Sequence, residues 1–484
     1  MELLSTRNAD ERIEAEKAVL RGIAPDGGLY VPSRFPGINA LGDITALSYP
    51  KLAAAVLGLF FENIRGLDGL AEKAYARFDV PDTAPVKKLS SGEYVLELWH
   101  GPTLAFKDMA LSVLPGLMAA AKTDKDILIL VATSGDTGKA ALEGFRDAPG
   151  IKIMVFYPHG GVSEMQRLQM ATQEGENTHV VAVRGNFDEA QNAVKAIFTD
   201  RAFSKAVYEK GYALSSANSI NFGRLAPQIA YYIWAWAELK RKGEIKAGEK
   251  INFAVPTGNF GNILAAWYAK RMGLPVNKLI CASNMNNVLT DFFNRGEYSL
   301  GRAFYKTMSP SMDILISSNL ERLLFEISGR DEKEVAAMMR RLKAEGAYSI
   351  SSQARDTLSK DFFADWCGEE ETRESLRETF ERKGYLLDTH TAVAAGVYEK
   401  YKRTGDGTKT VIVSTASAYK FPKDVLESLG EETAGLDGFA MAKKLASATG
   451  TKVPVQILEL RGKPERHTRV VDKDGLQDAV LEAL

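Results

Sequence analysis

The chain has 484 residues, 45% hydrophobic and 25% charged, a composition that suits a globular protein with two or three domains. Its 61 basic and 62 acidic residues nearly cancel to a net charge of −1, so no overall field draws it to nucleic acid or a membrane surface. A disordered or fibrous protein is excluded, and we expect small-molecule partners.

The start of the chain, its hydropathy and its cysteines bear on its location. MELLSTRNADERIEAE is charged from its first turns and lacks the apolar core of a secretory signal. The longest apolar stretch, residues 229–239, is shorter than the roughly 20 residues that span a bilayer and predicts a buried helix. The two cysteines, Cys281 and Cys367, form no CxxC motif and indicate a reducing compartment. We therefore expect a cytoplasmic protein.

Residues 1–90 differ from the rest of the chain. They have a mixed helical character, and the turn sequence Pro-Asp-Gly-Gly at residues 25–28 precedes a strand-like LYVP. We predict a small N-terminal domain here. A second change follows Gly430, where a helical stretch near residues 439–448 and the basic run RGKPERHTR receive no assigned function.

The first motif that could carry chemistry is HGPTLAFKD at residues 100–108. A Gly-Pro turn leads into a helix that starts near Phe106 and continues through MALSVLPGLMAAAK. Lys107 then lies in the first helical turn, where the helix dipole favours acidic residues. A lysine there is either an ordinary exposed residue or a desolvated amine of the kind that Schiff-base chemistry uses.

From Ile127 onward, short apolar runs alternate with segments of helical length. The runs are ILILVAT at Ile127, IKIMVFY at Ile151, HVVAVR at His179, NFAVP at Asn252, KLICAS at Lys278 and TVIVSTA at Thr410. The expected helices include residues 188–210, residues 261–272 and a solvated helix at residues 331–345. This alternation predicts an α/β fold with parallel sheet covered by helices.

The second motif, TSGDTG at residues 133–138, lies between the run ILILVA and a helix. Backbone amides at such a helix start, with the hydroxyls of Thr133, Ser134 and Thr137 nearby, can bind a carboxylate. An ordinary capped turn explains the motif equally well. A nucleotide P-loop is rejected, because Thr133 replaces its first glycine and Ala140 its magnesium-binding hydroxyl.

Two further motifs could bind anions. NSINFGR at residues 218–224 combines an amide, a hydroxyl and Arg224 just before a helix, although a surface arginine is the default interpretation. PTGNFGN at residues 256–262 follows a strand and opens a helix, and Gly258 and Gly261 let the backbone approach a phosphate closely. It does not match GxGxxG, so a dinucleotide is disfavoured.

Metal and serine-hydrolase chemistry find no support in the sequence. The five histidines show no ligand spacing and no GxSxG motif occurs, so we expect no metal site.

Taken in this order, the motifs resemble those of the fold-type II pyridoxal-phosphate enzymes, the tryptophan synthase β-like group, and specifically the threonine synthases of bacterial and yeast type. APDGGLYVP, SPSMDILISSNLERLL and DTHTAVAAGVY are also typical of that family. The resemblance covers nearly the whole chain. It implies an N-terminal threonine synthase domain at residues 1–90, a catalytic region at residues 91–430 and a C-terminal extension at residues 431–484. The catalytic region would comprise two α/β subdomains with the active site between them.

The resemblance also implies roles for individual residues. Lys107 would hold pyridoxal 5'-phosphate as a Schiff base and act as the catalytic base. The implied cofactor contacts are Phe106, Lys107, Asp136, Gly258, Asn259, Phe260, Gly261 and Thr415. The implied substrate contacts are Thr133, Ser134, Thr137, Asn218, Ser219 and Arg224. One departure is Ser417, which stands where many relatives carry histidine in the sequence Ser-Thr-Ala-His-Pro-Ala-Lys-Phe.

The implied activity is that of a lyase in amino-acid biosynthesis. It would convert O-phospho-L-homoserine and water to L-threonine and phosphate, the last step of threonine biosynthesis, by γ-elimination and β-addition of water. The implied assembly is a monomer or a homodimer. Two alternatives remain: a threonine or serine dehydratase or a sulfhydrylase of the same fold, which would not need a second phosphate site, and a catalytically silent cofactor-binding homologue.

Overall fold

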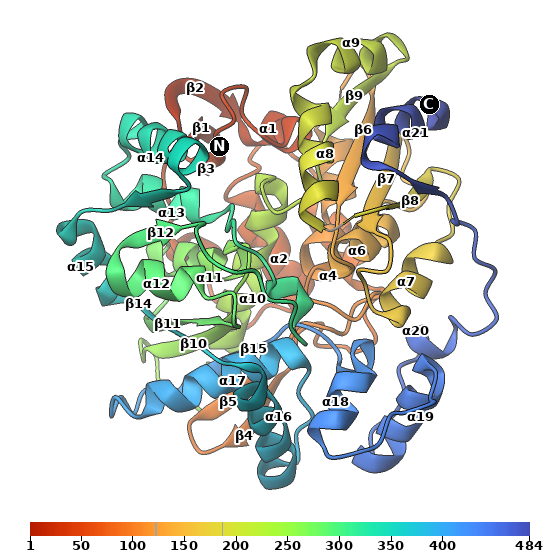
Figure 1. Ribbon diagram of the computed structural model, residues 1–484. Helices are drawn as coiled ribbons and strands as arrows, with labels where there is room; N and C mark the ends of the chain where they lie inside the picture. Colours follow the sequence, from red (N-terminus) through yellow and green to blue (C-terminus); the bar gives the residue numbers. More distant parts are fainter. Residues whose placement is uncertain (122, 186) are drawn as a thin grey trace.

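The computed structural model describes residues 1–121, 123–185 and 187–484, and it places two parallel sheets at the centre of the molecule (Figure 1). The larger sheet has the strand order β14-β11-β10-β15-β5-β4. Its strands are β4 (Val86–Ser90), β5 (Glu93–Glu97), β10 (Ile251–Pro256), β11 (Val276–Ser283), β14 (Phe362–Trp366) and β15 (Thr410–Ser414). Every neighbouring pair is parallel except β4 with β5.

The second sheet has the order β16-β8-β7-β6-β9, and all its strands are parallel. They are β6 (Asp126–Ala132), β7 (Ile151–Pro158), β8 (Thr178–Val183), β9 (Tyr212–Ser215) and β16 (Val470–Val471). All six predicted strands form, divided equally between the two sheets. Their continuous apolar runs are explained by burial on both faces, as in β10, where every residue is buried.

Helices cover both sheets, as the sequence predicts. The stretch at residues 229–239 lies within α10 (Phe222–Arg241), which is buried from Phe222 to Leu239. Residues 261–272 form α11 (Gly261–Arg271), and residues 331–345 form the exposed α14 (Glu332–Glu345). Among the described residues, none of the helices combines the length and the apolar character that a membrane crossing requires.

Two predicted helices are interrupted. The helix expected at residues 188–210 is divided into α8 (Phe187–Thr199) and α9 (Arg201–Glu209), because the Asp200 side chain caps the second helix by accepting from the backbone amides of Ala202 and Phe203. The helix expected after Phe106 is divided into α4 (Asp108–Leu111) and α5 (Leu114–Ala120). Its last predicted residue, Lys122, lies outside the described residues.

The N-terminal part combines a small antiparallel sheet with helices. The sheet has the order β2-β1-β3, with β1 (Glu2–Ser5), β2 (Asn8–Glu14) and β3 (Tyr30–Pro32), of which the sequence predicts only the last. The helix α1 (Ala15–Arg21) packs beside it, whereas α2 (Tyr49–Gly58) packs against α3 (Leu67–Tyr75) and α10. Tyr49 of α2 contacts Trp234 of α10 edge-on, with ring centroids 5.6 Å apart. This part therefore shares its core with α10.

The end of the chain returns to the second sheet. After α18 (Pro422–Ser428), the helices α19 (Gly438–Thr449) and α20 (Val455–Leu458) precede β16, which pairs with β8, and α21 (Leu476–Ala483) packs nearby (Figure 1). The remaining elements are α6 (Asp136–Phe145), α7 (Glu164–Ala171), α12 (Val288–Arg295), α13 (Leu320–Ile327), α15 (Ser352–Asp361), α16 (Glu369–Lys383), α17 (Thr389–Lys402), the strands β12 (Glu297–Ser299) and β13 (Ala347–Ser349), and the 3-10 helices η1 (Ile38–Leu41), η2 (Pro310–Met312), η3 (Ala418–Lys420) and η4 (Lys473–Gly475).

Candidate active site

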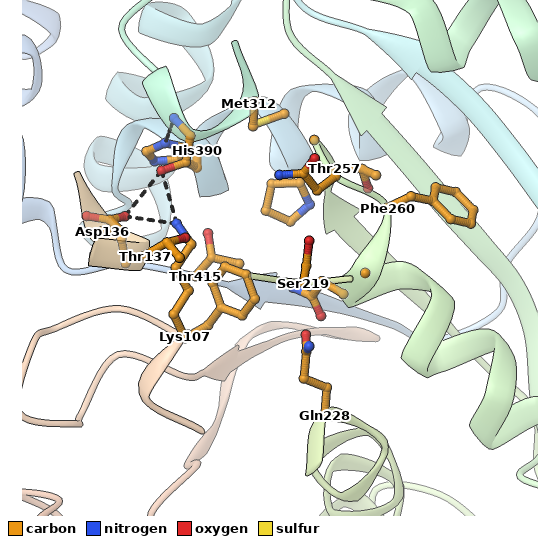
Figure 2. Close-up of a pocket in the computed structure, with 18 of the residues that line it drawn as sticks. Lys107, Asp136, Thr137, Ser219, Gln228, Thr257, Phe260, Met312, His390 and Thr415 are labelled. Carbon is orange, nitrogen blue, oxygen red and sulfur yellow. Dashed lines mark hydrogen bonds and ion pairs between the residues drawn. The ribbon is translucent and has the colours of Figure 1, made fainter. Parts of the chain in front are cut away.

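The predicted motifs meet at the carboxyl ends of the parallel strands. TSGDTG follows β6, PTGNFGN follows β10, and Thr415 follows β15. Ligands of open α/β sheets bind at this edge. One cavity is lined by every predicted site residue except Thr133 and Ser134 (Figure 2).

Thr133 stabilises the TSGDTG loop through its side chain. Its hydroxyl oxygen accepts hydrogen bonds from the backbone amides of Gly135 at 3.0 Å and Gly138 at 2.8 Å. Gly135 has a φ of 131°, and a Cβ there would lie 2.4 Å from the Gln166 side chain. The loop therefore holds its two glycines tightly and presents Asp136 and Thr137 to the cavity. Substrate contacts by Thr133 and Ser134 remain predictions.

The segment that carries Lys107 is fixed to the end of β15. The backbone amide of Phe106 donates to the carbonyl oxygen of Thr415 at 2.8 Å, and Leu104 accepts from the amide of Ser417 at 3.0 Å. Leu104 has a φ of 62°, which is uncommon for a residue other than glycine. Lys107 itself is the residue immediately before α4. Its position is thus set by backbone contacts with a buried strand end.

Lys107 is almost fully buried and touches two polar groups. Its Nζ donates to the hydroxyl oxygen of Ser311 at 3.3 Å and lies 3.6 Å from Oδ2 of Asp136. Burial lowers the pKa of Lys107 to about 8, since the attraction of Asp136 is opposed by the positive charges of Arg224 and Lys420. A lysine with this pKa is partly neutral near physiological pH, as a nucleophile or base must be.

Asp136 is a buried carboxylate with partners on both oxygens. Its Oδ1 lies 3.0 Å from Nζ of Lys420 and accepts from the Gln166 amide at 2.9 Å, while Oδ2 accepts from the Ser311 hydroxyl at 3.3 Å. Burial alone would raise its pKa. The charges of Lys420 and Lys107 outweigh burial and hold the pKa of Asp136 well below its ordinary value. Asp136 is therefore ionised.

The PTGNFGN loop has the geometry of an anion cradle. Helix α11 begins at Gly261, preceded by Phe260 in a left-handed conformation with a φ of 63°. A Cβ on Gly258 would lie 2.9 Å from the carbonyl oxygen of Ser311, so only glycine fits there. The side-chain oxygen of Asn262 accepts hydrogen bonds from the hydroxyls of Tyr231 and Tyr232. The Nδ2 donor of Asn262 is buried and has no partner among the described residues. The amide donors at the start of α11 and Nδ2 of Asn262 together suit a phosphate group.

Arg224 is a second group that calls for an anion. It is 4% exposed, and its Nη1 donates to the carbonyl oxygen of Ala217 at 3.0 Å. Its Nε has no partner in the part of the chain that the structure describes, and no carboxylate there pairs with it. Burial lowers the pKa of Arg224 to about 10, with Tyr231 acting in the opposite sense. A buried guanidinium without a counter-ion fits a bound phosphate or carboxylate.

Several residues of the cavity have no role in the sequence prediction. They are Gln228, Pro256, Thr257, Asn262, Ser311, Met312, His390 and Ala416. Ser311 and His390 lie within SPSMDI and DTHTAVAAG, two segments that already mark the family resemblance, so their presence was signalled but not their contacts. Ser417 does not line the cavity: its hydroxyl oxygen accepts from the backbone amide of Tyr419 at the start of η3.

Three family models match the chain in succession. The model described as threonine synthase N terminus matches residues 2–75, the model described as pyridoxal-phosphate dependent enzyme matches residues 83–353, and the model described as threonine synthase, C-terminal, matches residues 391–480.

Curated relatives agree with these models. The threonine synthase of Pseudomonas aeruginosa is 40% identical over 432 residues, which cover 88% of this chain and 90% of that protein. Human threonine synthase-like 1 is 40% identical over 451 residues, and the chain spans about 60% of that protein's length.

Two solved structures superpose along the whole chain. The pyridoxal-phosphate-bound threonine synthase of Brucella melitensis has a TM-score of 0.88 at 34% identity, and the match covers 100% of this chain and 99% of that protein. The yeast threonine synthase has a TM-score of 0.87 at 31% identity, again over 100% of this chain and 98% of its own.

Proposed function

The chain belongs to the threonine synthase family, and on that premise we propose that it converts O-phospho-L-homoserine and water to L-threonine and phosphate with pyridoxal 5'-phosphate as cofactor. One observation carries the choice of substrate: two separate groups suited to anions, the PTGNFGN loop and Arg224, line the same cavity as the buried Lys107. The PTGNFGN loop suits the phosphate that stays, and Arg224 suits the phosphate that leaves in each turnover.

In this proposal the cofactor, bound as a Schiff base to Lys107, supplies an electron sink for carbanions next to its imine carbon. Asp136 lies beside Lys107, where it can contact the ring hydroxyl of the cofactor. Thr415 carries a neutral hydroxyl, which can accept or donate one hydrogen bond but cannot stabilise a pyridinium charge as a carboxylate would. We therefore propose that the ring nitrogen stays unprotonated.

Lys107 would also have a second task, as a general base. Its amine, which contacts Ser311 and lies near Asp136, would remove protons from the α and then the β carbon of the substrate. Arg224 and Asn218 would hold the substrate phosphate through its departure from the γ carbon. Ser134 and Thr137 would meet the substrate carboxylate at the start of α6, where the helix dipole favours an anion.

The organisation of the chain follows the same proposal. We propose an N-terminal threonine synthase domain at residues 1–90, a catalytic region at residues 91–430 and a C-terminal extension at residues 431–484. The partner is the small substrate, the assembly a monomer or a homodimer, and the location cytoplasmic. The two buried, unpaired cysteines are compatible with a reducing compartment.

One pair of assays separates this function from its alternatives. Purified enzyme should release phosphate from O-phosphohomoserine and little ammonia from threonine. Ammonia release without phosphate release would identify a dehydratase, which has no use for an unpaired Arg224. Cofactor binding without either product would identify a catalytically silent homologue.

A further inference from the structure

A second buried lysine lies behind the catalytic site. Lys420, at the end of η3, is 0% exposed. Its Nζ donates to the carbonyl oxygen of Thr103 at 2.8 Å and to the side-chain oxygen of Gln169 at 3.1 Å, and it lies 3.0 Å from Oδ1 of Asp136. Burying an ammonium group is unfavourable unless its partners are well placed. Lys420 does not line the cavity, so direct contact with substrate does not explain this cost.

Lys420 and Lys107 share one carboxylate. Asp136 turns Oδ1 to Lys420 and Oδ2 toward Lys107, at 3.0 Å and 3.6 Å respectively. Two ammonium groups beside one carboxylate would leave an uncompensated positive charge in a buried site. Lys420 has three close polar partners, whereas the polar contacts of Lys107 among the described residues are Ser311 and the more distant oxygen of Asp136. The ammonium of Lys107 is therefore the less well compensated of the two.

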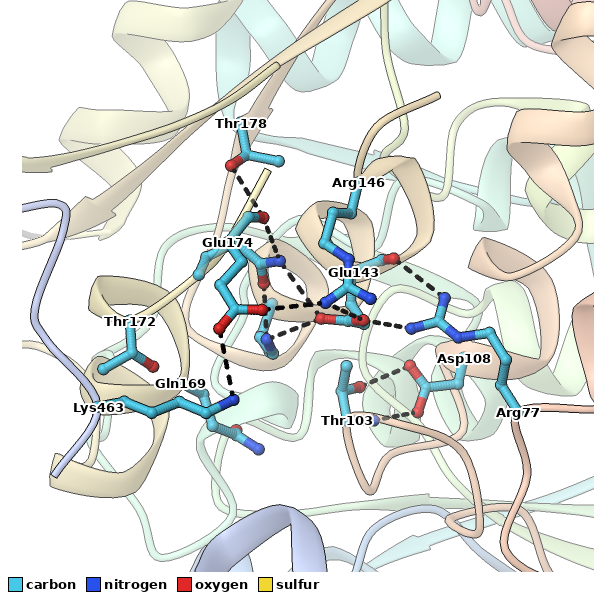
Figure 3. Close-up of polar contacts among 12 residues, drawn as sticks. Arg77, Thr103, Asp108, Glu143, Arg146, Gln169, Thr172, Glu174, Thr178 and Lys463 are labelled. Carbon is cyan, nitrogen blue, oxygen red and sulfur yellow. Dashed lines mark hydrogen bonds and ion pairs between the residues drawn. The ribbon is translucent and has the colours of Figure 1, made fainter. Parts of the chain in front are cut away.

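Lys420 also holds the segment on which Lys107 is carried. It binds the carbonyl oxygen of Thr103, and the amide and hydroxyl of Thr103 donate to the carboxylate of Asp108 at 2.8 Å and 2.6 Å (Figure 3). Asp108 is the residue after Lys107, and a Cβ on Gly101 would lie 2.5 Å from its side chain. The ammonium of Lys420 thus connects two segments that lie next to Lys107. One is the segment before α4, and the other is the start of α6.

Charged groups from four elements act on this site. Asp136 of α6, Arg224 of α10 and Lys420 of η3 act on Lys107, and His390 of α17 lines the same cavity. Behind them, the charge of Lys420 also acts on Asp108 and on Lys139 of α6. Lys139 pairs instead with Glu143 at 3.1 Å, within the separate cluster that Arg77 and Arg146 complete (Figure 3).

We propose that Lys420 is a positioning residue for Lys107: it balances the charge of Asp136 and fixes the segment at residues 100–108, so that the Lys107 amine is neutral when the cofactor or substrate requires it. This role rests on the proposed cofactor but not on the proposed substrate. A purely structural lysine would keep the fold together without altering the proton affinity of Lys107. The two roles therefore differ in a measurable quantity.

The test is the capture of added pyridoxal phosphate by the full chain freed of cofactor, followed by visible absorption as a function of pH. The rate rises as Lys107 loses its proton, and the pH of half-maximal rate reports its deprotonation. Lys420→Met removes a positive charge that repels the Lys107 ammonium, while the attraction of Asp136 remains. We therefore expect the pH of half-maximal rate to rise by about one pH unit. Lys139→Met, which removes a partly buried lysine of α6 that pairs with Glu143, should leave the midpoint unchanged.

Lys420→Met can leave the buried Asp136 carboxylate too poorly paired for the chain to fold. The double variant Asp136→Asn/Lys420→Met provides for that outcome, because it removes both partners of this pair. Its midpoint should fall to the wild-type value or below. A midpoint that stays at the wild-type value in Lys420→Met, or that remains raised in the double variant, overturns the proposal. A wild-type chain that shows no visible band at any pH would instead refute the proposed cofactor chemistry.

Discussion

The backbone amide of Ser311 donates a hydrogen bond to Nε2 of His390 at 3.1 Å, and this contact determines which ring nitrogen of His390 carries the proton. Because an amide can only donate, Nε2 is unprotonated, and the hydrogen resides on Nδ1, which lies 3.0 Å from Oδ1 of Asp388. His390 therefore holds η2 in place through this contact. The hydroxyl of Ser311, on that helix, is the group that reaches Lys107.

We predict that Ser311→Ala lowers kcat about fivefold, the effect of one lost hydrogen bond worth about 1 kcal/mol, with little change in KM. His390→Phe should have a similar effect, because the amide of Ser311 then loses its acceptor. His390→Gln, which restores an acceptor, should recover part of the rate. Steady-state kinetics of the three variants decide the point, and an unchanged kcat in Ser311→Ala contradicts it.

A second prediction concerns Arg224, which carries a buried charge without a counter-ion. Arg224→Met keeps an unbranched aliphatic side chain and removes the guanidinium group with its charge. We expect KM for O-phosphohomoserine to rise about 10- to 100-fold, as the loss of a charge-assisted hydrogen bond requires. The melting temperature of the free protein should not fall, because the variant no longer buries an unpaired cation. An unchanged KM would place the substrate phosphate elsewhere.

Gly258 provides a steric test of the cofactor loop. A Cβ there would lie 2.9 Å from the carbonyl oxygen of Ser311, so Gly258→Ala must displace the loop or η2. We predict weaker retention of pyridoxal phosphate on dialysis, measured by visible absorption. Gly37→Ala is the matched control, since its φ is −75° and nothing lies within 4 Å of the added Cβ. Equal retention in both variants would show that the loop does not hold the cofactor.

The burial of Lys107 should appear in the stability of the cofactor-free chain. Its pKa is lowered to about 8 in the folded state, so below pH 8 the folded chain must bury an ammonium group. Lys107→Met should therefore be more stable than wild type by about 3 kcal/mol at pH 7, and the difference should shrink as pH rises from 8 to 10.5 and vanish above. Denaturant unfolding at several pH values measures it. A difference independent of pH would refute the lowered pKa.

The sequence predicts the elements of this fold better than their grouping. Runs such as ILILVA are strands in either arrangement, because apolar character reports burial and not the neighbouring strand. The polar strand β2, in which no residue is buried, lacks the apolar alternation that would indicate a strand. The breaks in two predicted helices depend on local competition, as when the side chain of Asp200 caps α9.

The same limit applies to the candidate site. Loops with phosphate-binding chemistry can be recognised because their glycines and polar residues are adjacent in the sequence. Lys420 contacts Asp136 only in the folded chain, because hundreds of residues separate them in the sequence. His390 and Ser311 are likewise 79 residues apart. The hydroxyl of Thr133 also looks available in the sequence, yet two backbone amides of its own loop occupy it.

The most direct test of the proposed function is the stoichiometry of products when the holoenzyme is given O-phospho-L-homoserine alone. We predict one phosphate and one L-threonine for each substrate consumed, and no product from Lys107→Ala at the same concentration. Release of phosphate without threonine, or equal turnover by Lys107→Ala, would contradict the assignment of the reaction and of its base.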